Sequence, residues 1–435
     1  MDSEAEELRI AATEREQTFN DEVNRNFRWN FGVNLMYGLF GTTGWRLIFA
    51  PTFVPDYMFK LGGSNLIVGL LLSIGGASRF LTPPIIAPLV EHQPFIKRKA
   101  VLIGMLMRSQ VLLMALAGFF FPRNLNILSF FLFFSLFNMF LGMQNVVYNT
   151  VMAKVIPVAR RGRFIGVREF LGGVTAALVA LAAGKMIDSL EFPHSYAATY
   201  LLAFCFTFVG LICFSFTREP ATPSRLRKIP LLERLRSMPS LVRQDRNFAN
   251  YCICRGIGSL ALMSNPFLIL YVGNKMHIGG AQLGQLTFCY FTAQTCINLF
   301  FGRIADRRGF RHVFIISVLI WTLAMATLIV TPPSYALAAV IFFALGAGVG
   351  GFNMSMQNMV LEFGDTAELP MRLAVVNSIG ELATAVGPLL AGFLADNVSY
   401  RSVFAISIVC TTAALLVMRF RVAEPRYAGA ETAAE

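Results

Sequence analysis

The sequence predicts an all-α integral membrane protein in which twelve transmembrane helices form two pseudo-symmetric bundles of six. Three observations support this fold class: the composition, the spacing of apolar runs and an internal repeat. Of the 435 residues, 55% are hydrophobic and 14% are charged, and the mean hydropathy is +0.59. A soluble domain is typically about 25% charged. We therefore expect most of the protein surface to face lipid.

Apolar runs long enough to cross a bilayer occur in both halves of the chain. A spanning helix needs about 20 predominantly apolar residues. The first half contains runs near residues 30–54, 65–90, 100–121, 127–153, 164–187 and 197–217. The second half contains runs near residues 248–273, 282–304, 312–331, 334–361, 371–395 and 401–420. We expect one helix over each run, with short loops between them.

The second half of the chain repeats the first. Met143 and Pro157 return 213 positions later as Met356 and Pro370. Further pairs follow in the same order, with an offset that falls to 204: Asp188 with Asp396, Ser195 with Ser399, and Glu219 with Glu424. A solenoid repeat is much shorter, roughly 20 to 50 residues. Two long similar halves are typical of membrane transporters.

The repeat sets the predicted domain boundaries. We expect six-helix bundles over residues 28–217 and 247–420, joined by a basic linker over residues 218–246. That linker holds four prolines among arginines and lysines, so it cannot bury a core. Residues 1–27 and 421–435 are expected to be tails outside the membrane.

The basic residues predict the orientation of the chain. Its net charge is +12, and twenty Lys or Arg residues lie on one set of alternate loops against five on the other. Such an excess marks the cytoplasmic side. We therefore expect both termini in the cytoplasm and a location in the bacterial cytoplasmic (inner) membrane. The expected partner of the positive charge is the lipid bilayer rather than nucleic acid.

Several kinds of chemistry find no support in the sequence. The seven cysteines lie within predicted spans, where they are expected to be small buried hydrophobic residues rather than disulfide or metal ligands. No phosphate-binding glycine loop with Lys and Ser or Thr is present, and no set of catalytic residues can be assembled. We expect no enzyme activity, no cofactor and no metal.

A motif between the eighth and ninth predicted helices suggests a family. The chain there reads Gly302-Arg303-Ile304-Ala305-Asp306-Arg307-Arg308-Gly309-Phe310-Arg311. This sequence resembles the loop signature of the major facilitator superfamily, in its bacterial type. The resemblance implies that the acid and the arginines form a charge network that helps close one face. The implied cytoplasmic gate residues in this loop are Gly302, Asp306, Arg307, Gly309 and Arg311. The alternative is an ordinary basic turn.

The first half departs from the family pattern. Glu91 is the candidate acid of its equivalent loop, which lacks both glycines, and Arg168 with Glu169 can form a further gate pair. Asn138 stands where drug–proton antiporters have an arginine, and the Gly387-Pro388 pair lies in helix eleven instead of helix five. The two best sequence supports for drug–proton antiport are therefore missing.

Polar residues at helical spacing predict a substrate cavity between the two bundles. An ionisable group inside hydrocarbon costs about 2.5–3.5 kcal/mol or more, so each is a functional candidate. The resemblance implies a cavity lined by helices 1, 2, 4, 5, 7, 8, 10 and 11. The candidate residues on that set are Asn34, Tyr37, Arg46, Arg79, Asn138, Asn145, Gln294, Asn298, Asn353, Gln357 and Asn377. The alternative role for each amide is a structural hydrogen bond between helices.

Glu381 is the deepest carboxylate and the candidate for proton coupling. A carboxylate surrounded by apolar groups holds a proton more tightly than one in water, so it can exchange a proton as the cavity opens. The alternative is a permanent ion pair with Arg79. The arginines weakly favour an anionic substrate.

These features predict a secondary transporter of a small solute, with an organic anion favoured, which works by alternating access as a monomer. Two alternatives stay open: a drug or metabolite efflux transporter, and a membrane assembly factor or sensor that moves no solute. Import and export cannot be separated by these residues.

Overall fold

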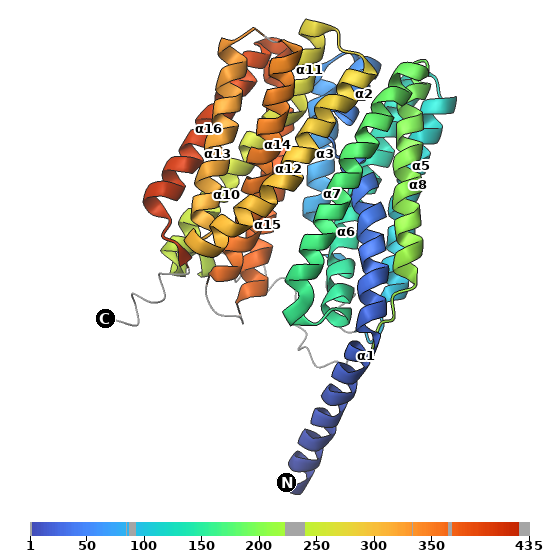
Figure 1. Ribbon diagram of the computed structural model, residues 1–435, viewed down its shortest axis with the longest axis vertical. Coiled ribbons are helices and arrows are strands. Elements are labelled where there is room, and N and C mark those ends of the chain that lie inside the picture. Colours follow the sequence, from blue (N-terminus) through green and yellow to red (C-terminus); the bar gives the residue numbers. More distant parts are fainter. Residues whose placement is uncertain are drawn as a thin grey trace.

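The computed structural model describes residues 2–83, 85–86, 93–221, 240–332, 334–363 and 368–425. Throughout these residues the regular secondary structure is helical. The helices run side by side across the molecule (Figure 1). Helix α1 begins and α16 ends on the same face, which we call the termini face, and the opposite one is the distal face.

The helical segments coincide with the predicted apolar runs. In the first half they are α1 (Asp2–Ile48), α2 (Phe53–Gly62), α3 (Asn65–Leu81), α5 (Lys97–Phe120), α6 (Arg123–Val155), α7 (Val158–Ser189) and α8 (His194–Ser215). In the second half they are α10 (Arg246–Ala261), η1 (Leu262–Ser264), α11 (Asn265–Met276), α12 (Gly280–Arg308), α13 (Phe310–Val330), α14 (Tyr335–Asn358), η2 (Met359–Glu362), α15 (Leu369–Asn397) and α16 (Tyr400–Arg421).

Membrane-spanning character is unequal among these helices. Within the described residues, nine segments are long and apolar enough to cross a membrane. The other three predicted spans lie on α1, α3 and α12, and α3 is apolar but described over only 17 residues. Two of these three helices carry an arginine in the interior of the fold, Arg46 on α1 and Arg79 on α3.

The first and seventh predicted helices are each broken in the middle. Helix α1 ends at Ile48 and the chain resumes as α2, whereas α10 ends at Ala261 and resumes through η1 as α11. These two ends are 213 positions apart, the offset of the sequence repeat. The predicted helix over 30–54 is thus interrupted at residues 49–52, whereas the one over 248–273 contains a 3-10 turn at Leu262–Ser264 and remains one candidate span, Arg246–Met276. Pro51 lies within the first break, where it disfavours helix at the residue before it. Pro266 lies in the first turn of α11, where its missing N–H costs no hydrogen bond.

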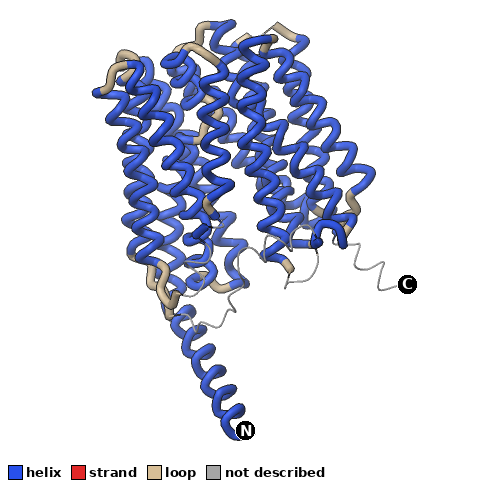
Figure 2. The backbone as a smooth tube through the Cα atoms, turned by 180° about the vertical axis from the view of Figure 1, so that it is seen from behind, coloured by secondary structure: helices blue, strands red, loops and turns tan. Residues whose placement is uncertain are grey.

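The N-terminal segment is helical, in contrast to the predicted tail. Residues from Asp2 to 27, predicted as a tail, have helical backbone continuous with α1 and project beyond the bundle (Figures 1 and 2). Most of the predicted linker, residues 222–239, and the candidate gate residue Glu91 lie outside the described residues.

The helices pack in two groups that follow the repeat. In the first, α1 packs on α7 and α8, and α5 packs on α6 and α8. In the second, α13 packs on α14 and α16, and α10 packs on α15 and α16. The groups meet where α3 crosses α15 and α7 crosses α12, and also where α2 touches α11. These crossings contain the charged residues described next.

Candidate functional site

The two deepest charges predicted from the sequence form an ion pair across the interface. Arg79 Nε on α3 lies 3.0 Å from Glu381 Oε2 on α15. Arg79 Nη1 also donates to the side-chain oxygen of Asn138 on α6, and its guanidinium lies 5.6 Å from the centre of the Phe49 ring. The Thr384 hydroxyl donates to the same Glu381 oxygen at 3.2 Å. Both halves thus contribute to one charged group.

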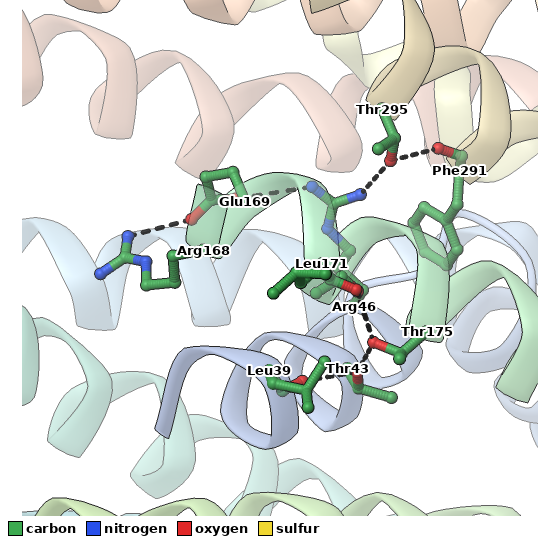
Figure 3. Close-up of polar contacts among 10 residues, drawn as sticks. Leu39, Thr43, Arg46, Arg168, Glu169, Leu171, Thr175, Phe291 and Thr295 are labelled. Carbon is green, nitrogen blue, oxygen red and sulfur yellow. Dashed lines mark hydrogen bonds and ion pairs between the residues drawn. The ribbon is translucent and has the colours of Figure 1, made fainter. Parts of the chain in front are cut away.

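A second charged group lies at the other crossing (Figure 3). Arg46 Nη1 on α1 donates to the Thr295 hydroxyl on α12 at 3.2 Å, and its Nη2 lies 3.5 Å from Glu169 Oε2 on α7. Glu169 also pairs with Arg168 at 2.9 Å, and Arg168 Nη1 donates to the Tyr148 hydroxyl at 2.7 Å. The structure therefore places Arg168 and Glu169, the two candidate gate residues of α7, beside Arg46.

Arg255 on α10 adds a charge from the second half to these two groups. We call the six residues together the charged layer: Arg46, Arg79, Arg168, Glu169, Arg255 and Glu381. The guanidinium of Arg255 lies against the backbone of Gly380 and 5.8 Å from the centre of the Phe352 ring, and it is attracted to the Glu381 carboxylate. Its Nε and Nη1 nitrogens are buried and have no hydrogen-bond partner. A buried donor without a partner costs about 1–3 kcal/mol, so these two nitrogens are candidates, within the described residues, for binding an acceptor.

The predicted cavity residues divide into bonded and unbonded side chains. Asn34 is fully buried and donates to Asn30 and to the Thr217 hydroxyl, so it lies in an interface within the first half. Tyr37 packs there too, with its ring on Tyr148. The other amides, apart from Asn138, make no hydrogen bond to the described residues: Asn145, Gln294, Asn298, Asn353, Gln357 and Asn377.

The predicted loop gate lies within the second half. Gly309 ends α12 with φ of +82°, a conformation that favours glycine. The backbone N–H of Arg311 donates to Glu424 Oε2 at 3.0 Å, and its side chain donates to the Met418 carbonyl at 3.1 Å. Asp306 and Arg307 are exposed, and Gly302 lies 3.9 Å, measured from an added Cβ, from the nearest methionine.

Several hydrogen bonds join the two halves of the described chain. Those between Arg79 and Glu381 and between Arg46 and Thr295 lie in the charged layer, and others lie between this layer and the distal face. Thr52 bonds with Thr287 at 2.7 Å, and the N–H of Leu389 donates to Ser73 at 2.9 Å. The carboxylates of Asp188 and Asp396 accept the bonds nearest the distal face. The distal side is therefore closed.

Sequence reasoning missed four residues of the site and its surroundings. Thr295 and Arg255 were not among the candidate residues. Asp188 and Asp396 had been matched as repeat mates without a role. Their signal was present, since a pair of acids retained at both repeat positions suggests the same contact made twice.

The sequence pattern of the Major Facilitator Superfamily matches residues 34–265 and again residues 251–435. A curated relative, the vacuolar basic amino acid transporter 5 of Saccharomyces cerevisiae, is 25% identical over 166 residues. That match covers 36% of this chain and 28% of the relative's length.

Solved transporter structures have the same fold. The D-xylose-proton symporter is 12% identical with a TM-score of 0.72, and the match covers 92% of this chain and 99% of that one. The nucleoside transporter NupG, in a mutant form, is 12% identical with a TM-score of 0.71, covering 90% and 99%. The human organic anion transporter MFSD10 is 15% identical with a TM-score of 0.63, covering 90% and 99%. Together with the sequence match, these findings show that the chain belongs to the Major Facilitator Superfamily of membrane transporters.

Proposed function

We propose that the chain is a secondary transporter that carries a small organic anion by alternating access. The observation that supports this most is that Nε and Nη1 of Arg255 are buried without a hydrogen-bond partner among the described residues. The layer around this arginine holds four arginines, Arg46, Arg79, Arg168 and Arg255, and two glutamates, Glu169 and Glu381. Four positive and two negative charges leave two positive charges in excess. A carboxylate or similar anion would offset them and accept the free N–H groups of Arg255.

The relatives agree with transport but differ in the charge of their solutes. One neighbouring fold belongs to an organic anion transporter, whereas the partial sequence relative is a transporter of basic amino acids. A cationic solute would meet a net repulsion from this layer. The charge balance of the chain's own residues therefore favours the anion.

The proposed route places the termini face in the cytoplasm. Twenty basic residues against five on alternate loops support this orientation. The structure then represents a conformation closed on the outer side. Asn145, Gln357 and Asn377, which are exposed, lie on the cytoplasmic side of the charged layer, where they can meet a solute entering from that face.

Uptake into proteoliposomes tests the anion proposal. Radiolabelled monocarboxylates, dicarboxylates and basic amino acids are offered to the purified protein, and we expect uptake of a carboxylate. Hydrogen bonds to charged groups contribute about 1.5–3 kcal/mol. Arg255→Gln should therefore lower kcat/KM about ten- to a hundredfold, while Arg255→Lys should retain part of it. Arg401→Gln, an exposed arginine on α16, is the control.

The outcomes separate the alternatives. Uptake of basic amino acids alone, or normal carboxylate uptake by Arg255→Gln, would refute the anion proposal. Absence of flux for every class, with folded protein in the membrane, would favour the assembly factor or sensor.

Glu381 is proposed as the proton-exchanging group of this transporter. It joins the two halves through Arg79, so a proton on its carboxylate would neutralise Glu381, leave the charge of Arg79 without its counter-charge and weaken the α3–α15 crossing. Glu381→Gln mimics the protonated form. Because glutamine cannot release or take up a proton, we expect this variant to lose uptake driven by an imposed proton gradient. We expect it to retain exchange of internal for external substrate, which needs no net proton movement. Glu169→Gln, whose glutamate pairs inside one half, should keep the proton-driven uptake. Normal proton-driven uptake by Glu381→Gln would refute proton exchange at Glu381 and favour the alternative, a permanent ion pair with Arg79.

A further inference from the structure

Asp396 near the end of α15 joins the two halves at the distal face. Its Oδ1 accepts the backbone N–H of Asn65 at 3.0 Å, and its Oδ2 accepts that of Leu66 at 2.8 Å. The Ser64 hydroxyl and the Asn65 side-chain amide donate to the same carboxylate at 2.6 and 2.8 Å. A carboxylate of the second half thus binds the first N–H groups of α3, a helix of the first half.

Asp188 at the end of α7 makes the same contact in the opposite direction. Its Oδ1 accepts the N–H of Gly280 at 2.5 Å, and its Oδ2 accepts the N–H of Ala281 at 2.7 Å. These are the first N–H groups of α12 in the second half. Asp188 and Asp396 are repeat mates, so the duplicated fold makes this contact twice around its pseudo-symmetry axis. We call the two carboxylates the distal caps.

The chemistry of the distal caps suits a contact that forms and breaks. The first N–H groups of a helix have no partner within it, and the helix dipole adds positive potential there. A carboxylate satisfies two of these donors with charge-assisted bonds. Both aspartates are exposed, and no cation within the described residues pairs with either. Water can therefore replace the helix ends when the halves separate.

Close backbone packing directs the helices toward the caps. An added Cβ at Gly184 would lie 2.5 Å from the carbonyl oxygen of Gly280, and one at Gly392 would lie 2.5 Å from that of Asn65. The helices can approach this closely only because these positions lack side chains. Each cap therefore lies beside a crossing at which the two helix backbones approach closely.

We propose that Asp188 and Asp396 are paired conformational determinants that hold the distal face closed and set the balance between the two access states. The proposal rests on the alternating access proposed above, but not on the identity of the solute. For the distal face to open, the N-termini of α3 and α12 must leave these carboxylates. Their removal therefore favours the state open on the distal side.

Pulsed electron–electron distance measurements in lipid nanodiscs test this proposal. Two spin-label pairs are placed in a background that lacks the seven native cysteines. Asn124→Cys with Thr331→Cys reports the distal face, and Gly162→Cys with Arg308→Cys reports the termini face, because all four positions are exposed. For D188A/D396A we expect the population with a long distal distance to rise tenfold or more, and the termini-face distance to shorten.

Matched controls separate conformation from folding. Glu219→Ala and Glu424→Ala remove carboxylates that cap helices inside one half, and they should shift neither label pair. D188N/D396N keeps the side-chain length and should give a smaller shift in the same direction. This milder variant also provides the measurement if D188A/D396A does not fold.

The outcomes distinguish the two proposals. Unchanged distances in folded D188N/D396N and D188A/D396A protein would overturn the role of the distal caps, as would lengthening of both label pairs together. A longer distal distance with an unchanged termini-face distance would support the caps but contradict alternating access.

Discussion

The four acids at two repeat positions use the same local chemistry on opposite faces of the molecule. On the termini face, Glu219 accepts the N–H groups of Ile96 and Lys97 at the start of α5, and Glu424 accepts the N–H of Arg311 near the start of α13. Each of these contacts stays within one half. On the distal face, the caps reach across to the other half. The same contact between a carboxylate and a helix start therefore stabilises one half on the termini face and joins the two halves on the distal face.

The surroundings of the acids differ as these roles require. Glu219 has only 2% of its side chain exposed and pairs with Lys154 at 3.1 Å. Asp188 and Asp396 are exposed and bind neutral donors. Breaking a buried ion pair leaves an uncompensated charge, whereas an exposed carboxylate regains water. The termini-face contacts are therefore costly to break and the distal ones are not.

The two glutamates of the charged layer show the same division. Glu169 pairs with Arg46 and Arg168 inside the first half. Glu381 pairs with Arg79 of the opposite half. A change of charge at Glu381 acts directly on the interface, and for this reason the second half carries the proposed coupling.

The largest predicted effect is on the stability of the first half. Glu219→Ala leaves Lys154 without its partner, and removing one member of a buried pair costs about 3–5 kcal/mol. We expect a clear drop in Tm, measured by thermal unfolding in detergent. Glu191→Ala, an exposed acid on the distal side, is the control. Equal Tm values for the two variants would end the distinction between buried and exposed acids.

A larger residue at the distal crossing should oppose closure. Gly184→Leu would place its Cβ 2.5 Å from the Gly280 carbonyl oxygen, and overpacking of this kind costs about 1–3 kcal/mol. We expect the closed distal population to fall five- to a hundredfold in the distal label pair. Gly166→Leu on the same helix is the matched control, because an added Cβ there meets no atom within 4 Å. A closed distal face in Gly184→Leu would show that the glycines do not limit closure.

The smallest predicted effect concerns a hydrogen bond that only one of the two distal caps has. Ser64 donates to Asp396 at 2.6 Å, whereas Gly279 stands at the start of α12 and offers no hydroxyl to Asp188. A typical hydrogen bond contributes about 0.5–1.5 kcal/mol. Ser64→Ala should therefore raise the open distal population about two- to tenfold. Ser189→Ala removes a hydroxyl that bonds its own helix and should have no effect. An equally large rise in the open distal population for Ser189→Ala would contradict the role given to the bond between Ser64 and Asp396.

Much of the fold could be predicted because lipid limits the possible structures. A chain inside hydrocarbon must satisfy its backbone hydrogen bonds within helices, so each apolar run indicates a helix. The internal repeat indicated two similar halves. The cost of burying charge singled out Arg79 and Glu381, which the structure joins in one ion pair.

The site could be predicted only in part. Helical spacing shows which residues share a face but not which helix covers that face. Asn34, Asn138 and Asn145 were thus all predicted to line the cavity. Asn34 and Asn138 are hydrogen-bonded to protein groups, whereas Asn145 is exposed. The pair of Arg168 with Glu169 was expected from the sequence, but the contacts of Arg168 with Tyr148 and of Glu169 with Arg46 were not.

The sequence by itself determined the helices, their repeat and the presence of deep charges, because apolar length and charge cost act locally along the chain. The tertiary structure alone decided which partner each polar group has. Asp188 lies in the last turn of one spanning helix of the first half and Glu219 follows another, but Asp188 caps a helix of the opposite half and Glu219 caps one of its own. That difference comes from where α12 and α5 begin in space, a result of packing between residues far apart in the chain.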